Sequence, residues 1–162
     1  MSHQAEYKAN EHRAEFLSVR LGAQEFAFDI RSIREIRGWI ASTHLPYAPH
    51  CIKGMINLRG SVLVVVDLAE RLGLSAAEPG AASVVVVVEH QGRAAGLLVD
   101  AVCDIITVTD EMRQRTPDTG SEMPREFIQG LVMMDNRIIS ILAIGSLIPE
   151  ESVQQMAERA AA

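Results

Sequence analysis

GMINLRGSVLVVV, residues 54–66, can be laid over GLVMMDNRIISIL, residues 130–142, without a gap. Both stretches begin with glycine and carry apolar residues on either side of a short turn. Two strand-like runs joined by two residues are typical of a β-hairpin. The two stretches therefore predict the same hairpin twice in one chain.

A second pair of stretches repeats in the same order. AFDIRSIREI, residues 27–36, lies over GLLVDAVCDI, residues 96–105, and the match pairs Ile30 with Val99, Ile33 with Val102, Glu35 with Asp104 and Ile36 with Ile105. A recurrence of two blocks indicates two similar β units. Each unit is too small to be stable alone, so we expect the two to share or interleave their cores.

The rest of the chain also favours strands. In FLSVRLGAQEFAFDI, residues 16–30, apolar side chains alternate with others, which predicts a hairpin that turns at Gly22. Further strands are predicted at residues 33–37, 55–58, 62–66, 84–89, 94–99, 102–108, 128–134 and 137–142. Many short strands separated by turn residues indicate an all-β barrel or sandwich.

Three other segments have separate interpretations. The valines at 84–88 are typical of a central strand buried on both faces, with an exposed docking edge as the alternative. Short helices are predicted at 67–74, where Asp67 serves as the cap, and at 149–162, as a terminal helix or tail. The stretch 109–126 reads as a long loop, with a helical turn at 110–115 as the alternative.

Composition excludes several classes of function. The chain has 15 Lys and Arg against 21 Asp and Glu, so its net charge of -6 repels nucleic acid and anionic lipid. Its polar start lacks the apolar centre of a signal peptide, and its apolar runs are far shorter than the roughly 20 residues of a membrane span. We therefore expect a cytoplasmic protein that binds no nucleic acid and does not insert into the membrane.

Motifs of catalysis are missing from the sequence. It carries no nucleophile elbow and no phosphate-binding glycine loop. His44, His50 and Cys51 lie close together, but no second ligand cluster has zinc spacing, so ordinary loop and core roles are favoured over a metal site. The two cysteines, Cys51 and Cys103, are expected to be reduced. We predict a protein without catalytic residues, cofactor or metal, and keep a small hydrolase or ligand-binding barrel as the alternative.

The turn of the first hairpin contains an unexpected arginine. The second hairpin turns at Asp135 and Asn136, which tolerate positive φ, whereas the first has Arg59 followed by Gly60. Gly60 is suited to the turn, but arginine gives no such advantage. Arg59 is either a solvated charge on a loop tip or a functional residue.

The functional interpretation of Arg59 needs a partner group. Strand alternation would place Ile33, Glu35 and Arg37 on one face, where Glu35 could pair with Arg59. Beside exposed Ile33 or Val84, this pair would form an apolar groove with one charged anchor. Such a groove suits a partner helix.

Four stretches carry a resemblance to a known family. EFAFDIRSIREIRG, LPYAPHCIKGMINLRGSVLVVVDL, GLLVDAVCDI and FIQGLVMMDNRIISILAIGSLI together resemble the CheW-type chemotaxis coupling proteins. The resemblance covers residues 16–148, between a flexible N-terminal segment at 1–15 and the helix or tail at 149–162. Its most specific part is IKGMINLRG, residues 52–60, followed by a valine-rich strand and Asp-Leu.

The resemblance implies a fold of two intertwined five-stranded SH3-like β-barrels. It also implies a non-enzymatic adaptor that couples the cytoplasmic tips of methyl-accepting chemoreceptors to the regulatory domain of the histidine kinase CheA, in arrays at the inner face of the membrane. An adaptor of a pathway for surface motility or biofilm formation is the alternative.

The resemblance also implies where the receptor binds. In the family the helical receptor tip docks in a groove between the barrels. The matching receptor-binding residues are Ile33, Glu35, Gly54, Arg59, Val84 and Gly96. No kinase-binding residues can be assigned.

Overall fold

Eleven strands form two sheets in the part of the chain that the structure describes. A computed structural model describes residues 13–39, 51–75, 78–114 and 125–149. The first sheet has the order β8-β1-β2-β11-β10-β9 and the second β3-β6-β7-β5-β4. The strands are β1 (Arg13–Leu21), β2 (Gln24–Asp29), β3 (Ile33–Gly38), β4 (Ile52–Leu58), β5 (Ser61–Asp67), β6 (Val84–His90), β7 (Arg93–Val99), β8 (Ala101–Thr109), β9 (Arg113–Gln114), β10 (Ile128–Met134) and β11 (Arg137–Leu142).

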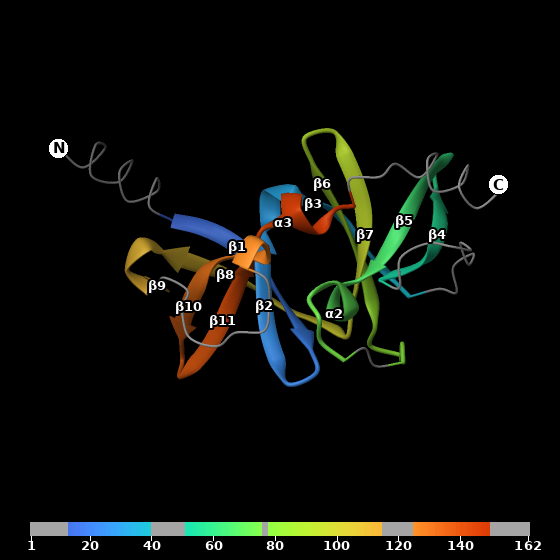
Figure 1. The fold of residues 1–162 in the computed structure, drawn as a ribbon. Coiled ribbons are helices and arrows are strands. Elements are labelled where there is room, and N and C mark those ends of the chain that lie inside the picture. The colour runs from blue at the N-terminus through green and yellow to red at the C-terminus, as the bar shows by residue number, and fades with distance from the viewer. Residues whose placement is uncertain (1–12, 40–50, 76–77, 115–124, 150–162) are drawn as a thin grey trace.

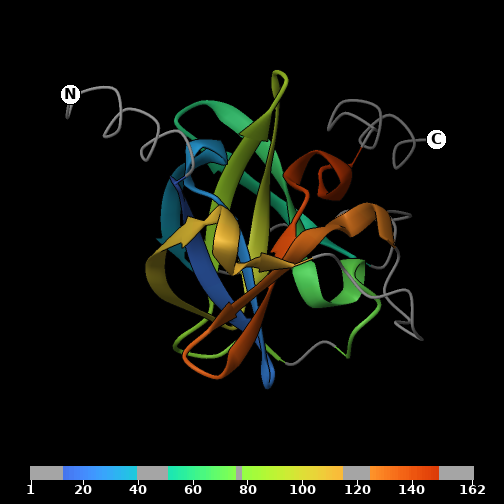
Figure 2. The same ribbon diagram turned by 90° about the vertical axis from the view of Figure 1, so that its left-hand side faces the viewer.

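The two sheets curl into SH3-like barrels that stand side by side (Figure 1). We call the sheet that contains β1 barrel 1 and the sheet that contains β3 barrel 2. In Figure 2 barrel 1 lies in front, with the strands of barrel 2 behind it. The predicted all-β class and barrel architecture are confirmed, with the two-residue β9 as an addition to the five strands expected in barrel 1.

The barrels are interleaved through two strands. The hairpin β1–β2 belongs to barrel 1, but the next strand, β3, pairs with β6 in barrel 2. The hairpin β6–β7 belongs to barrel 2, and the next strand, β8, pairs with β1 in barrel 1. Each barrel thus contains strands from both halves of the chain, in agreement with the interleaving that the repeat predicted. Barrel 1 combines β1 and β2 with β8 to β11, and barrel 2 combines β6 and β7 with β3 to β5.

The repeated hairpins share one register, including a bulge. In β4–β5, Ile52 pairs with Val66 and Gly54 with Val65, so that one residue is skipped. In β10–β11, Ile128 pairs with Leu142 and Gly130 with Ile141, again with one residue skipped. Bulges of this kind bend a strand and help a sheet to close.

Among the described residues, apolar side chains form three cores. The largest lies between the barrels and contains residues of both sheets, among them Phe26 and Phe28 of β2 and Val86 and Val88 of β6. Each barrel also encloses a smaller interior core. The interior of barrel 1 contains Phe16, Ala27, Ile106, Val108, Val132, Ile139 and Ile141, and that of barrel 2 contains Leu63, Val65, Val85, Val87 and Leu98.

Two short helices cover the junction of the barrels, α2 (Leu68–Arg71) below and α3 (Ile144–Leu147) above in Figure 1. Asp67 caps α2 as predicted, because its side chain accepts a hydrogen bond from the Glu70 amide. The helix is shorter than the predicted 67–74, and α3 was not predicted. Arg71 of α2 donates to the Ser146 carbonyl at 3.1 Å and lies over the Phe127 ring, which ties the two helical ends together.

Four other segments predicted from the sequence can be compared with the structure. β1 begins at Arg13, inside the segment 1–15 that was expected to be flexible. The long stretch 109–126 contains a 3-10 turn, η2 (Asp110–Met112), followed by β9, which agrees with the helical-turn alternative. The helix expected at 149–162 lies outside the described residues, apart from Pro149. Val85 to Val88 are buried in β6 between β3 and β7, which confirms the central strand.

The described residues can also be compared with the predictions for cysteines, metal sites and membrane spans. Cys51 and Cys103 are free thiols, and burial raises the pKa of Cys51, which keeps it protonated. His44 and His50 lie outside the described residues, and within those residues no cluster of three or more His, Cys, Asp or Glu could hold a metal. Among the described helices, none is long and apolar enough to cross a membrane.

Candidate partner-binding site

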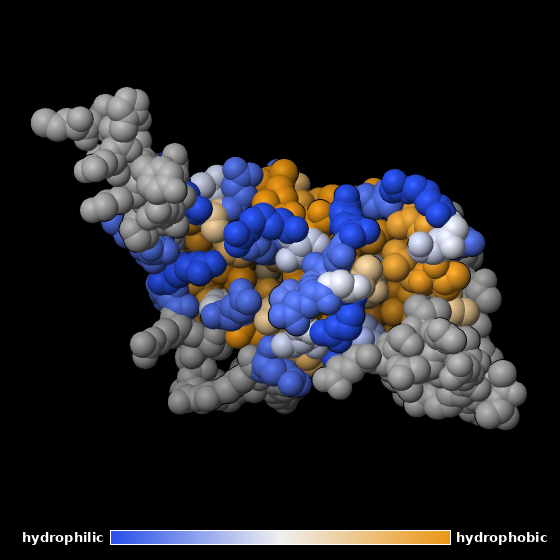
Figure 3. Space-filling view, turned by 90° about the horizontal axis from the view of Figure 1, so that it is seen from above, coloured by the Kyte–Doolittle hydropathy of each residue, from blue (hydrophilic) through white to orange (hydrophobic). Residues whose placement is uncertain are grey.

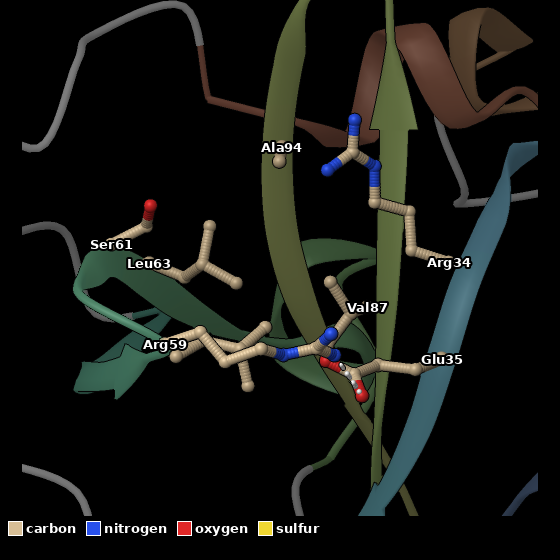
Figure 4. A pocket seen from close by; sticks show the side chains of 8 residues that line it. Arg34, Glu35, Arg59, Ser61, Leu63, Val87 and Ala94 are labelled. Atoms are coloured by element: carbon tan, nitrogen blue, oxygen red, sulfur yellow. Dashed lines mark hydrogen bonds and ion pairs between the residues drawn. The ribbon is translucent and has the colours of Figure 1, made fainter.

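A pocket of about 420 Å³ opens at one end of barrel 2. All of its lining residues belong to that barrel, and Figure 4 shows their side chains converging from strands β3, β5, β6 and β7 and from the β4–β5 turn. We call it the mouth pocket. It is lined by Arg34, Glu35, Leu58, Arg59, Ser61, Leu63, Val87 and Ala94.

An ion pair spans the mouth pocket. Arg59 reaches from the β4–β5 turn to β3, where its Nη2 donates to Glu35 Oε2 at 2.8 Å (Figure 4). The Arg59 side chain is 77% exposed and that of Glu35 only 26%. The predicted pairing is confirmed, and the charge that the pair presents to a partner is the positive one.

A bulge in β3 brings two charged residues to the rim. Ile33 pairs with Val88 and Glu35 with Val87, so Arg34 is the extra residue between them. A bulge changes the face on which the following side chains lie. Arg34 forms an ion pair with Glu89 and lines the pocket together with Glu35.

The bulge overturns the expected alternation of β3. Ile33 and Glu35 were predicted to share one face, but Ile33 packs against the core between the barrels while Glu35 faces the mouth pocket. Val84 also packs against that core, and it pairs with Gly38, at the end of the β3–β6 ladder away from Ile33. Neither apolar residue lines the pocket that holds Arg59.

The turn at Arg59 is strained. Both turn residues lie in the left-handed region, Arg59 at φ 52° and Gly60 at φ 86°. The Gly60 amide donates to Asn57 Oδ1 at 3.0 Å, which stabilises the turn. We had expected Gly60 alone to make this turn. The turn instead also needs Arg59 in a left-handed conformation that arginine rarely adopts.

The two glycines of the predicted set have backbone roles in barrel 2, and their contact with a receptor stays a prediction. Gly54 lies in the β4 bulge at φ 155°, in a conformation that side chains rarely adopt. Gly96 is buried in β7, and a Cβ there would lie 2.6 Å from Cγ1 of Val85. Both glycines shape barrel 2 and contribute no side chain to a partner.

Sequence reasoning missed most of the pocket lining. Ser61 and Ala94 are small, and Leu63 and Val87 read as ordinary strand residues. The internal repeat did contain a signal, since the residues that correspond to Ser61 and Ala94 in barrel 1 are large and charged.

The surface around the pocket mixes apolar and charged side chains. Seen from above, hydrophobic side chains gather over barrel 2 at the right of the view, beside strongly hydrophilic ones (Figure 3). A convergent apolar hollow with a few placed charges is typical of a binding site. Among its lining residues, no nucleophile contacts a base.

Comparison with protein families agrees with this geometry. The model of the CheW-like domain matches residues 15–152. This chain belongs to the CheW-like domain family. Since the match covers most of the chain, both barrels belong to one domain of that family.

Individual relatives carry names from chemotaxis. The chain is 45% identical over 141 residues to the probable chemotaxis protein CheW of Rhizobium etli, covering 87% of this chain and 91% of that protein. It is 44% identical over 151 residues to the chemotaxis protein CheW of Rhizobium meliloti, covering 93% and 97%.

A solved structure supports the same family. The scaffolding protein TtCheW of Thermoanaerobacter tengcongensis superposes with a TM-score of 0.75 at 28% identity, covering 80% of this chain and 88% of that one. The chain is therefore a CheW-family scaffold of chemotaxis.

Proposed function

We infer that this chain is a non-enzymatic adaptor that couples the cytoplasmic tips of chemoreceptors to the histidine kinase CheA. The observation that carries the inference is the Glu35–Arg59 pair. Two residues 24 positions apart in the sequence meet at 2.8 Å over a pocket whose lining is half apolar and half polar, and both match receptor-binding positions of the CheW-type resemblance.

The proposed mechanism depends on held geometry rather than on bond chemistry. An adaptor that binds receptor and kinase at once raises the effective concentration of each for the other. It also couples their states if its affinity differs between receptor conformations. The interleaved barrels suit this role, because the chain crosses between them at β3 and at β8 and so links them to each other.

The test is ATP-dependent phosphorylation of CheA in membranes that contain receptors. Three samples are compared: no addition, the wild-type chain and its Arg59→Ala variant. We expect strong activation by the wild type and little by the variant, because truncation removes the exposed cation and releases Glu35.

A circular dichroism spectrum of Arg59→Ala is the control. The exposed pair contributes at most about 1 kcal/mol to stability, so the variant should remain folded. If the wild type does not activate the kinase with matched partners, the proposed function is wrong.

A further inference from the structure

The two barrels can be compared residue by residue at their mouths. β1–β2 and β6–β7 share one register, since Ser18 pairs with Ala27 and Val87 with Gly96. The neighbouring parallel pairings also correspond, since Ile141 pairs with Ala27 and Val65 with Gly96. These registers place Ser18, Glu25 and Arg137 of barrel 1 where barrel 2 has Val87, Ala94 and Ser61.

In barrel 1 these three positions are joined in a polar network. Arg137 Nη1 donates to both carboxylate oxygens of Glu25, at 2.9 and 3.1 Å. Ser18 Oγ donates to Glu25 Oε2 at 3.2 Å. The Glu25 side chain is only 15% exposed. We call these three residues the plug, because their side chains occupy the end of barrel 1.

In barrel 2 the same positions are empty of large polar groups. Ala94 and Ser61 are too short to meet across the end of the barrel, and Val87 offers no polar atom for them to bind. The mouth pocket is lined by all three. The pocket is thus the space that the plug fills in barrel 1.

A second hollow lies beside the plug, on the outer face of β11. It measures about 400 Å³ and is lined by Glu25 and Arg137 together with Ala23, Gln24, Ile138 and Ser140. Ile138 and Ser140 alternate with the interior residues Ile139 and Ile141 of β11, so they lie on its outer face. That hollow therefore does not correspond to the mouth pocket of barrel 2.

Exposure of the charges around the mouth pocket indicates what it accepts. Arg59 is far more exposed than its partner Glu35, and Arg34 is 62% exposed against 30% for its partner Glu89. At both pairs the cation faces outward. A partner that brings a carboxylate to this rim is complementary in charge, and one that also brings an apolar side chain can cover Leu58 and Leu63.

We propose that the mouth pocket receives one apolar side chain from the receptor helix, beside a receptor carboxylate that binds Arg59. This inference rests on the proposed function and adds the chemistry of the contact. The missing plug makes barrel 2, rather than barrel 1, the receptor-binding end, which differs from the groove between the barrels that the resemblance implied. An anchor residue in a pocket with a charged rim is the usual form of a dominant binding contact.

The experiment transfers the plug from barrel 1 to barrel 2. The double variant Ala94→Glu, Ser61→Arg copies Glu25 and Arg137 at their corresponding positions. Co-sedimentation with receptor-containing membranes measures its affinity, and we expect a loss on the order of tenfold or more relative to wild type. Thermal unfolding checks that the variant is folded.

Two further variants make the test decisive. Ile105→Arg places the same guanidinium at an exposed position of β8 in barrel 1, away from the mouth pocket, and should bind receptor like wild type. Ala94→Met fills the pocket without adding charge and should also lose binding. If the double variant does not fold, Ala94→Met carries the test.

Three outcomes have distinct meanings. If wild type does not sediment with receptor membranes, the proposed function itself fails. If wild type binds and the folded pocket-filling variants bind equally well, the mouth pocket is not the contact and this inference is overturned. If wild type forms a dimer that the filled variants do not form, the occupant is a second copy of the chain, and the receptor assignment is likewise overturned.

Discussion

The two barrels have the same backbone pattern and different mouths. Their hairpins share register and bulge, and each barrel combines strands from both halves of the chain. Barrel 1 ends in the buried carboxylate of Glu25 held by Arg137, whereas barrel 2 ends in a pocket with an exposed arginine at its rim. Backbone repetition therefore sets the scaffold, and a few side chains at one end decide what each barrel can bind.

The largest effect is expected inside barrel 2. Barrel 1 has Ala27 where barrel 2 has Gly96, and a Cβ at Gly96 would lie 2.6 Å from the stiff side chain of Val85. Gly96→Ala should lower the free energy of unfolding by about 1–3 kcal/mol through overpacking. Urea unfolding of this variant measures the loss, and an unchanged midpoint would show that the barrels have equal interior space.

The next effect concerns the plug. Arg137→Ala leaves the largely buried Glu25 carboxylate without its cation, although Ser18 still donates to it. We expect a loss of about 1–2 kcal/mol, moderated by solvent because Arg137 is 44% exposed. Arg59→Ala should cost less in the same urea experiment. A larger loss of stability for Arg59→Ala than for Arg137→Ala would contradict a structural role for Arg137 and an exposed, non-structural position for Arg59.

A smaller, pH-dependent effect is expected where the chain crosses from barrel 1 to barrel 2. Asp29 accepts hydrogen bonds from the Arg31 side chain and backbone, and the side-chain bond is the main cause that lowers the pKa of Asp29 below its ordinary 3.8. A lowered pKa stabilises the fold above pH 3.8 and loses that contribution as pH falls through the folded value.

Asp29→Asn tests this crossing. It should cost below about 1 kcal/mol at pH 7. The difference from wild type should disappear as the pH falls below the folded pKa of Asp29. Urea midpoints measured between pH 7 and pH 2.5 give the comparison, and a constant difference over that range would assign the effect to something other than ionisation.

The smallest effect on stability is expected at the first hairpin turn. Arg59→Asn supplies a residue that accepts positive φ, as Asn136 does in the second hairpin, and removes the exposed ion pair. Relief of strain and loss of the pair oppose each other, so the free energy of unfolding should change by less than about 0.5 kcal/mol. A decrease of several kcal/mol in the free energy of unfolding, measured in urea, would show that Arg59 has a structural role.

Much of this arrangement could be read from the sequence. Matching residues 54–66 with 130–142 predicted the repeated hairpin, and the absence of turn chemistry at Arg59 suggested the hypothesis that this residue has another role. The Glu35–Arg59 pair was predicted from opposite charge, although the strand alternation used to place Glu35 was wrong. These features depend on local pattern, which a single sequence contains.

Other features depend on how distant strands align. The bulge at Arg34 puts Ile33 and Glu35 on opposite faces of β3. An arginine at that position does not predict a bulge. The mouth pocket exists because Ala94 and Ser61, which lie on different strands, are both small at one end of a barrel. Only the registers of several strands show that these residues meet, and that their counterparts form the plug.

The most direct test of the account compares the two arginines in one assay. Arg59→Ala and Arg137→Ala remove the same kind of side chain from corresponding ends of the two barrels, and both are measured by co-sedimentation with receptor-containing membranes at a temperature where each is folded. The account predicts that Arg59→Ala loses receptor binding while Arg137→Ala keeps it. Equal binding by the two variants, or a loss confined to Arg137→Ala, would contradict the assignment of the receptor site to barrel 2.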